Sequence, residues 1–284
     1  MNTALCLIGY GAGVAALAPP LLIRAAGTGC APRLGVVAWL LALVTATGSV
    51  LDGLAALAGS ANVWLATFGW AVLAASGARA GWAGVVTWSG VRARRRAHRQ
   101  IVAILGRPDP VLGVVMVQAA ERLVYCLPAP VATVVVTTAA RDALSGSQLS
   151  AVLAHERTHL AGRHHVLLAV VHAASRAFPW LTLFAQAAPQ IAALLEMRAD
   201  DAAARTHGRR TVAAAIAAMS ARPAPVGALG AAGPSALQRG LRLCRAEPVW
   251  RAHLGRLALA SAVAALAAGP YLSAILPPCP HVWW

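Results

Sequence analysis

Long apolar runs dominate this sequence and constrain its fold more than any other feature. Three lie in the first ninety residues and one lies near the C-terminus: Leu5 to Ile23, Leu34 to Leu51, Val63 to Val91 and Leu257 to Leu276. Each reaches the roughly 20 residues that a helix needs to cross a bilayer. Charged residues make up only 12% of the chain, against about 25% in soluble globular proteins. We therefore expect a multi-span membrane protein.

The third run contains a charge, Arg79, that complicates its assignment as a span. A charge at the bilayer centre costs about 3 kcal/mol on insertion scales. Arg79 could snorkel to the interface, lie between helices, or mark a break between two shorter helices. We expect about three transmembrane helices in residues 1–90, and a final transmembrane helix with a short tail in residues 256–284.

An arginine-rich segment, Arg92 to Arg99, follows the third run directly. Basic residues beside a span mark its cytoplasmic side, so residues 91–255 are predicted to be a cytoplasmic domain. Three spans before it place the N-terminus outside, and Arg24 and Arg33 then fall in a cytoplasmic loop, which agrees. Direct nucleic-acid binding is not expected, because the segment lacks interleaved aromatic residues and a recognisable binding fold.

The predicted cytoplasmic domain is more mixed in character. Val131 to Thr138 is β-branched and flanked by prolines, which predicts a strand. Ser147 is a plausible N-cap for a following helix. Residues 166–188 are apolar but contain His172, Arg176 and Pro179, so they could form a fourth span, a re-entrant hairpin or a helix packed against the membrane.

The segment that carries chemistry is His155-Glu156-Arg157-Thr158-His159, an H-E-x-x-H motif. Residues four apart share a helix face, so both imidazoles can reach one ion while Glu156 lies beside them. Zinc is bound by such nitrogen donors, and catalytic sites keep a position open for water. We therefore predict that His155 and His159 are metal ligands and that Glu156 is the catalytic base.

A third ligand is expected downstream, in Glu196-Met197-Arg198-Ala199-Asp200. Glu196 can coordinate the metal. Asp200, four residues later, can accept a hydrogen bond from the second nitrogen of a ligand histidine and fix its tautomer. His164 and His165 do not have the spacing of a longer histidine motif, so we interpret them as interface or substrate-side residues. The five cysteines include no C-x-x-C pair and indicate neither a disulfide framework nor a cysteine zinc site.

The motif in context, from Ser150 to His165 and again from Glu196 to Asp200, resembles the integral-membrane gluzincins. These include the HtpX and CAAX prenyl protease group and the BlaR/MecR antirepressor group, and the layout of spans is more similar to the latter. Only a short tail follows the last run, so no extracellular β-lactam-binding domain is expected.

The resemblance implies a mainly α fold: a multi-span membrane protein with a zincin-like metallopeptidase domain that contains a small β-sheet. It implies one zinc ion and hydrolysis of a protein or peptide substrate at the cytoplasmic face of the cell membrane, with a cytosolic repressor as one candidate. An edge strand is expected to bind the substrate, through Thr133, Val134, Val135, Val136, Thr137 and Thr138. The alternative is a non-catalytic membrane signalling or scaffold protein that retains the peptidase fold.

Overall fold

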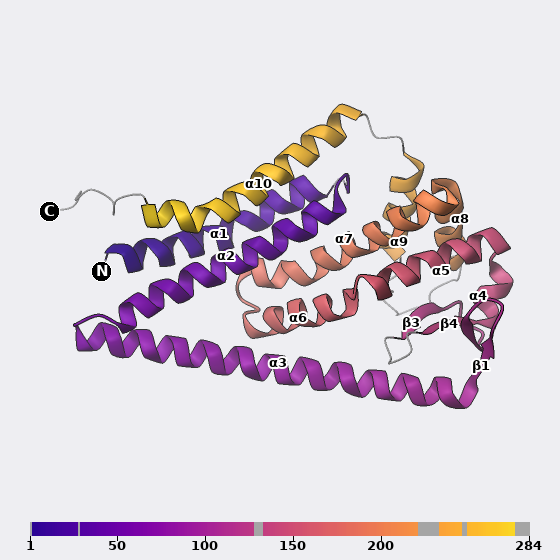
Figure 1. The fold of residues 1–284 in the computed structure, drawn as a ribbon, viewed down its shortest axis with the longest axis horizontal. Helices are drawn as coiled ribbons and strands as arrows, with labels where there is room; N and C mark the ends of the chain where they lie inside the picture. The colour runs from indigo at the N-terminus through magenta and orange to yellow at the C-terminus, as the bar shows by residue number, and fades with distance from the viewer. Residues whose placement is uncertain (1, 28, 128–132, 221–232, 246–248, 276–284) are drawn as a thin grey trace. The chain divides into compact units, whose positions relative to one another are not determined.

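The computed structural model describes residues 2–27, 29–127, 133–220, 233–245 and 249–275, and these form ten helices and four strands (Figure 1). The chain divides into two compact units. Unit 1 comprises residues 1–88, 168–194 and 249–284, and unit 2 comprises residues 89–167 and 195–248. The predicted fold class, mainly helical with a small sheet and apolar helices, is confirmed.

Unit 1 is built on three apolar helices, α1 (Asn2–Ala26), α2 (Pro32–Ala58) and α10 (Val249–Ile275). Small residues let α1 and α2 approach closely: a side chain at Gly11 would collide with α2, and one at Gly53 would collide with α1. Thr45 of α2 donates a hydrogen bond to the carbonyl of Leu266 in α10, 3.1 Å away. By length and composition, Thr3–Ala26, Pro32–Ala58 and Ala252–Gly269 could cross a membrane.

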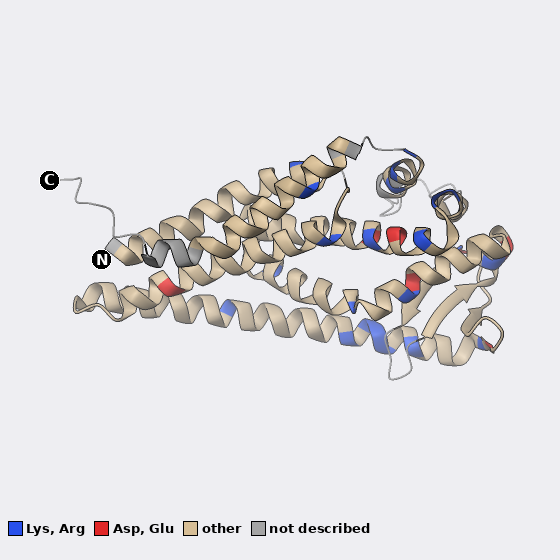
Figure 2. Cartoon of the chain, turned by 45° about the horizontal axis from the view of Figure 1, so that its top comes forward, with Lys and Arg blue, Asp and Glu red and all other residues tan. Residues whose placement is uncertain are grey.

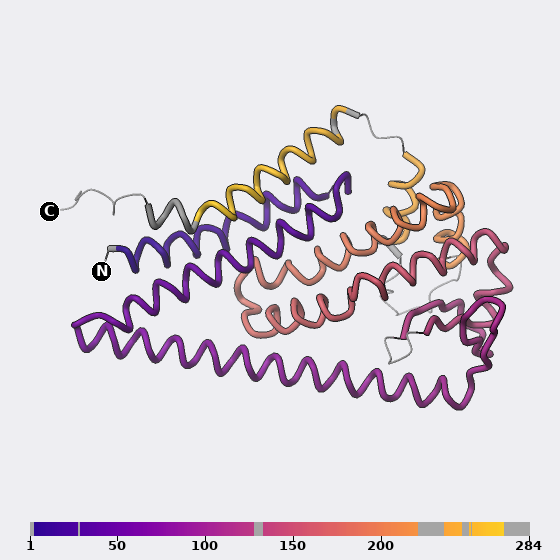
Figure 3. The backbone as a smooth tube through the Cα atoms, viewed as in Figure 1, coloured from indigo at the N-terminus to yellow at the C-terminus, as the bar shows by residue number. Residues whose placement is uncertain are grey.

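The third expected span differs from the prediction. Helix α3 (Val63–Leu105) is 43 residues long and runs through Arg79. The tube in Figure 3 shows it as one continuous helix. In the part of the chain that the structure describes, α3 is not among the helices apolar enough to cross a membrane. Its Gly, Ser and Trp residues, together with Arg79, dilute the apolar character that we took for a span.

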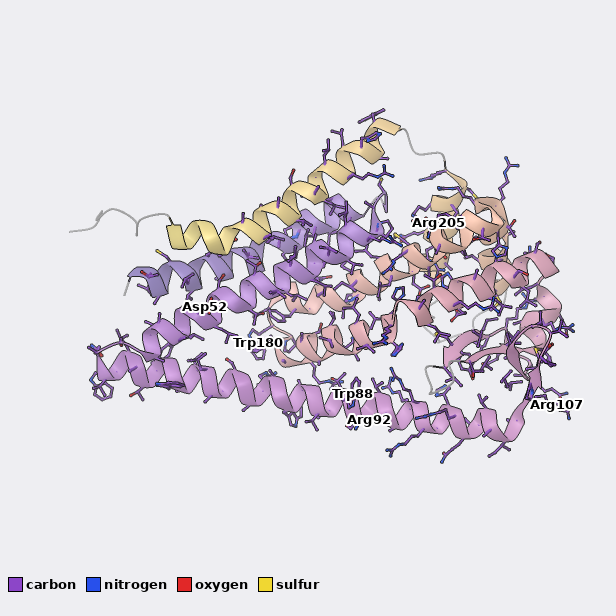
Figure 4. All side chains as sticks on the ribbon, in the orientation of Figure 1. Asp52, Trp88, Arg92, Arg107, Trp180 and Arg205 are labelled. Carbon is purple, nitrogen blue, oxygen red and sulfur yellow. The ribbon has the colours of Figure 1, made fainter. Side chains whose placement is uncertain are left out.

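Arg79 is accommodated by the turn between α6 (His164–Ala177) and α7 (Thr182–His207). Its guanidinium lies 4.5 Å from the centre of the Trp180 ring and donates to the carbonyl of Ala177. Trp180 is labelled at this turn in Figure 4. Of the three alternatives, the structure therefore shows an arginine lying between helices. The apolar segment 166–188 forms parts of two helices joined by this turn.

Unit 2 contains a four-stranded sheet in the order β1-β2-β4-β3, formed by β1 (Gly106–Asp109), β2 (Val114–Val117), β3 (Val124–Leu127) and β4 (Thr133–Thr137). Strand β4 pairs with β2 in parallel and with β3 antiparallel. Val134, Val135 and Val136 are buried on it. The prediction that Thr133–Thr138 forms an edge strand is therefore wrong, because β4 has a neighbour on each side. β-Branched residues suit an interior strand equally well, and the edge strand next to β4 is β3.

Unit 2 also contains the C-terminal part of α7 and four further helices: α4 (Thr138–Ala143), α5 (Gly146–Ala161), α8 (Arg209–Ser220) and α9 (Gly233–Cys244). Helix α5 packs on the sheet through Leu149 and Leu153, which are buried among Val134 and Val136. Its N-cap is Ser145 rather than Ser147, since Ser145 and Gln148 form a reciprocal capping box.

Candidate metal centre

Helix α5 presents the H-E-x-x-H residues on one side. The capping box at Ser145 sets where the helix begins, and burial of Leu149 and Leu153 sets which face meets the sheet. His155 and His159, one turn apart, then bring their Nε2 atoms to 3.1 Å from each other. Both side chains are largely buried, with 12% and 14% of their surface exposed.

Helix α7 supplies the carboxylate that faces the two imidazoles. Its buried stripe of Leu195, Ala199 and Ala203 fixes the rotation of the helix in unit 2. Glu196 then lies with one oxygen 3.5 Å from Nε2 of His155 and the other 3.4 Å from Nε2 of His159. These three residues form a group able to hold a metal ion.

The separations between the donor atoms fit a tetrahedral metal. Ligand atoms about 2.0–2.1 Å from zinc lie ~3.3 Å apart in ideal tetrahedral geometry. Here the two Nε2 atoms are 3.1 Å apart, and the Glu196 carboxylate approaches them through a different oxygen each, at 3.5 Å from His155 and 3.4 Å from His159. Two imidazoles and one carboxylate also form the ligand set of catalytic zinc sites that keep a fourth position open. The residues present therefore fit a zinc ion.

Asp200 lies behind His155, as its spacing suggested. Its side chain is fully buried, and Oδ1 is 3.0 Å from Nδ1 of His155. A proton on Nδ1, donated to this carboxylate, leaves Nε2 as the nitrogen of His155 that can bind a metal. Burial raises the pKa of Asp200, but hydrogen bonds from Arg239 and His155 outweigh it and lower the pKa to about 2.

Arg239 was not predicted from the sequence, yet it contacts two of the three acids on α7, Glu196 and Asp200. From α9, its Nε and Nη2 donate to the two oxygens of Asp200 at 2.7 and 2.6 Å, and its Nη1 lies 2.7 Å from Glu196. One turn along α9, Arg242 pairs with Asp201 at 2.7 Å. Nothing in the sequence distinguishes Arg239 from the other arginines, because α9 follows α7 after a long intervening segment and only tertiary folding joins them.

Glu156 faces the sheet beside the imidazoles. Its carboxylate can accept hydrogen bonds from the thiol and from the main-chain N–H of Cys126 on β3. Burial raises the pKa of Glu156, an effect that the nearby His155 partly offsets. Burial and the neighbouring Glu156 raise the pKa of the Cys126 thiol to about 12, so the thiol stays protonated as a donor. A carboxylate with a raised pKa beside the ligands is suited to accept and return a proton.

His164 was interpreted as an interface or substrate-side residue, but the structure buries it against a ligand histidine. It lies at the start of α6 with 1% of its surface exposed, and its Nδ1 is 2.9 Å from Nδ1 of His159. His165 next to it is half-buried, and burial together with the charges of Arg95 and Arg163 lowers its pKa. The five-residue interval from His159 was the available signal for His164, but it matched no motif that we considered.

Comparisons with known proteins place this geometry in context. Residues 92–224 match the sequence model of peptidase family M48. This range includes α5 and the acidic residues of α7, whereas Arg239 lies beyond it. No curated protein and no solved structure matches the chain. The family match, with a histidine–histidine–glutamate group able to bind a metal, supports a metallopeptidase domain similar to that of peptidase family M48.

Proposed function

We propose that this protein is a membrane-bound, zinc-dependent endopeptidase that binds one zinc ion through His155, His159 and Glu196. The observation that carries the proposal is the meeting of two imidazoles and one carboxylate, with contacts of 3.1 to 3.5 Å between them and Glu156 next to His155 on the same helix. A non-catalytic scaffold is the alternative, and retention of all three ligands together with the base weighs against it.

The chemistry follows from these side chains. Zinc, when bound, supplies a Lewis acid that lowers the pKa of water and polarises a peptide carbonyl. Glu156 takes the proton from the attacking water and passes it to the leaving amide nitrogen, so that a carboxylate and an amine are released. Asp200 holds the ring of His155, and Arg239 holds the carboxylates of Asp200 and Glu196.

We place the substrate backbone along β3, the strand beside Glu156. Leu123 accepts a hydrogen bond from the N–H of Thr137, and Val124 lies opposite Val136 in the register. Because inward and outward N–H groups alternate along an antiparallel strand, the N–H groups of Val124 and Cys126 point away from β4. That direction agrees with the contact between Cys126 and Glu156, and an extended peptide can add to this edge.

The proposed setting is the cell membrane, with the peptidase domain in the cytoplasm. Apolar helices of unit 1 support the membrane association. Blue arginines gather on the second half of α3, after the Trp-bearing first half (Figure 2), as expected of a cytoplasmic flank. We propose a cytosolic protein as the substrate, with a transcriptional repressor as the first candidate.

The test uses full-length protein purified in detergent. Its metal content is measured by plasma emission spectrometry, and its cleavage of reduced casein is compared with that of Glu156→Gln. The amide cannot take a proton, so the variant should retain about one zinc per chain and lose at least about a hundredfold in rate. Glu121→Gln changes an exposed acid in the same unit and is the matched control. Wild-type protein without zinc, or Glu156→Gln with full activity, would refute the proposal.

A further inference from the structure

The two ligand histidines are held by different kinds of partner. His155 faces a carboxylate, that of Asp200, at 3.0 Å. His159 faces another imidazole, that of His164, at 2.9 Å between the two Nδ1 atoms. The rings of His159 and His164 meet edge to face, with their planes 88° apart. His164 therefore occupies, for His159, the place that Asp200 occupies for His155.

Hydrogen-bond chemistry fixes which nitrogen carries the proton. If Nε2 of His159 is a metal ligand, its Nδ1 must carry the ring proton and donate it. Nδ1 of His164 then accepts, so His164 is neutral and protonated on Nε2. Two protonated nitrogens could not form this 2.9 Å contact, and two unprotonated ones would have no hydrogen to share.

The backbone between α5 and α6 leaves space for the imidazole ring of His164. Gly162 follows α5, and a side chain there would collide with Nε2 of His164. Arg163 then adopts φ 47°, a left-handed conformation that only a small fraction of non-glycine residues adopt. This turn brings His164 back under α5. Its Nε2 is buried and has no hydrogen-bond partner among the described residues. The imidazole of His164 therefore makes its hydrogen bond through Nδ1, to His159.

We propose that His164 is a positioning residue: it accepts a hydrogen bond from Nδ1 of His159 and so directs Nε2 of His159 at the metal. The inference rests on the proposed metal site and deepens it. His164 does not touch the metal or the substrate. Its contribution is to hold the tautomer and ring orientation of one ligand, an effect on metal affinity of roughly 10- to 100-fold for comparable partners.

The test compares variants of the full-length protein by zinc affinity, measured by competition with a chromogenic chelator. His164→Phe keeps an aromatic ring but cannot accept, and should weaken zinc binding roughly 10- to 100-fold. His164→Asn places an amide oxygen near the position of Nδ1 and should recover most of the affinity. His165→Phe alters the neighbouring histidine, which makes no hydrogen bond to His155, His159 or Glu196 among the described residues, and should leave affinity unchanged.

A spectroscopic measurement accompanies the titration, because a simple packing defect would not produce it. Cobalt-loaded His164→Phe should show a shifted visible absorption band, whereas His164→Asn should resemble the wild type. Wild-type zinc affinity in His164→Phe, or equal losses in the Phe and Asn variants with matching unfolding temperatures, would overturn the inference. Wild-type protein that binds no zinc would instead refute the proposed function, so the two failures are distinguishable.

Discussion

Arg239 donates hydrogen bonds to both carboxylate oxygens of Asp200, at 2.7 and 2.6 Å. It lies on α9, far along the chain from the H-E-x-x-H helix α5. Asp200 is fully buried, so its charge depends on this bidentate pair and on His155 for compensation. The same guanidinium also contacts Glu196 at 2.7 Å. One side chain thus connects a metal ligand with the carboxylate that orients another ligand.

Replacing Arg239 by Gln should therefore affect both stability and metal binding. A buried charge left without its partner typically costs about 3–5 kcal/mol, and zinc affinity should fall with it because Glu196 and Asp200 lose their support. Arg242→Gln is the matched control on the same helix. Its partner, Asp201, keeps 31% of its side-chain surface exposed, whereas Asp200 is fully buried, so the loss should be smaller than that of Arg239→Gln. Chemical unfolding and chelator competition measure the two effects, and equal losses in both variants would contradict the prediction.

Metal affinity should rise with pH in the neutral to alkaline range. Burial lowers the pKa of His155, but hydrogen bonds to Asp200 and Glu196 outweigh it and raise the pKa to about 9. Below that pKa a proton occupies the ring and competes with the metal, so affinity should increase about tenfold for each pH unit up to about 9.

A variant of Asp200 checks the origin of this dependence. Asp200→Asn removes the charge that favours protonated His155, so its affinity should vary less steeply between about pH 7 and 9. Isothermal titration with zinc at several pH values gives both profiles. A wild-type affinity that stays constant over this range would contradict the assigned role of His155.

Proline substitutions along β3 should separate substrate binding from folding. Val124→Pro removes an N–H that points away from β4, so the sheet should persist while kcat/KM for an extended substrate falls. Tyr125→Pro removes an N–H that points toward β4 opposite Val135 and should destabilise the sheet. Far-UV circular dichroism and peptide cleavage distinguish the two cases. Full activity in a folded Val124→Pro protein would exclude substrate from this edge.

Cysteine labelling will decide whether the first half of α3 crosses the membrane. In a protein without its native cysteines, Ala61→Cys and His98→Cys flank that half of the helix. If it crosses, a membrane-impermeant maleimide added to intact cells should label position 61 and not position 98. Labelling at both positions, or at neither, would place them on the same side and remove α3 from the spans.

Site residues that share one helix could be predicted from their spacing in the sequence. Site residues that meet only through tertiary packing could not. The four-residue spacing of His155 and His159 is local, and the second four-residue pair, Glu196 and Asp200, depends only on α7. Arg239 became part of the site through tertiary packing of α9, which leaves no periodic trace in the sequence.

The sheet and the helices show the same limit. A run of valines predicted a strand correctly at β4, but could not show whether that strand lay at an edge or in the interior, since its neighbours are set by the topology. Strand β3, only four residues long, carried no alternating pattern to detect. Proline usually ends or kinks a helix, yet α1 continues through both Pro19 and Pro20.

The charges around the ligands imply a preference for a dication. Four carboxylates, those of Glu156, Glu196, Asp200 and Asp201, gather with two guanidinium groups, those of Arg239 and Arg242. A divalent ion offsets the negative charge of these groups, so the loaded centre can remain largely buried. Removing the ion leaves that charge uncompensated, and protons must replace it. Chelation of this protein should therefore be accompanied by proton uptake from the buffer, the thermodynamic converse of metal binding.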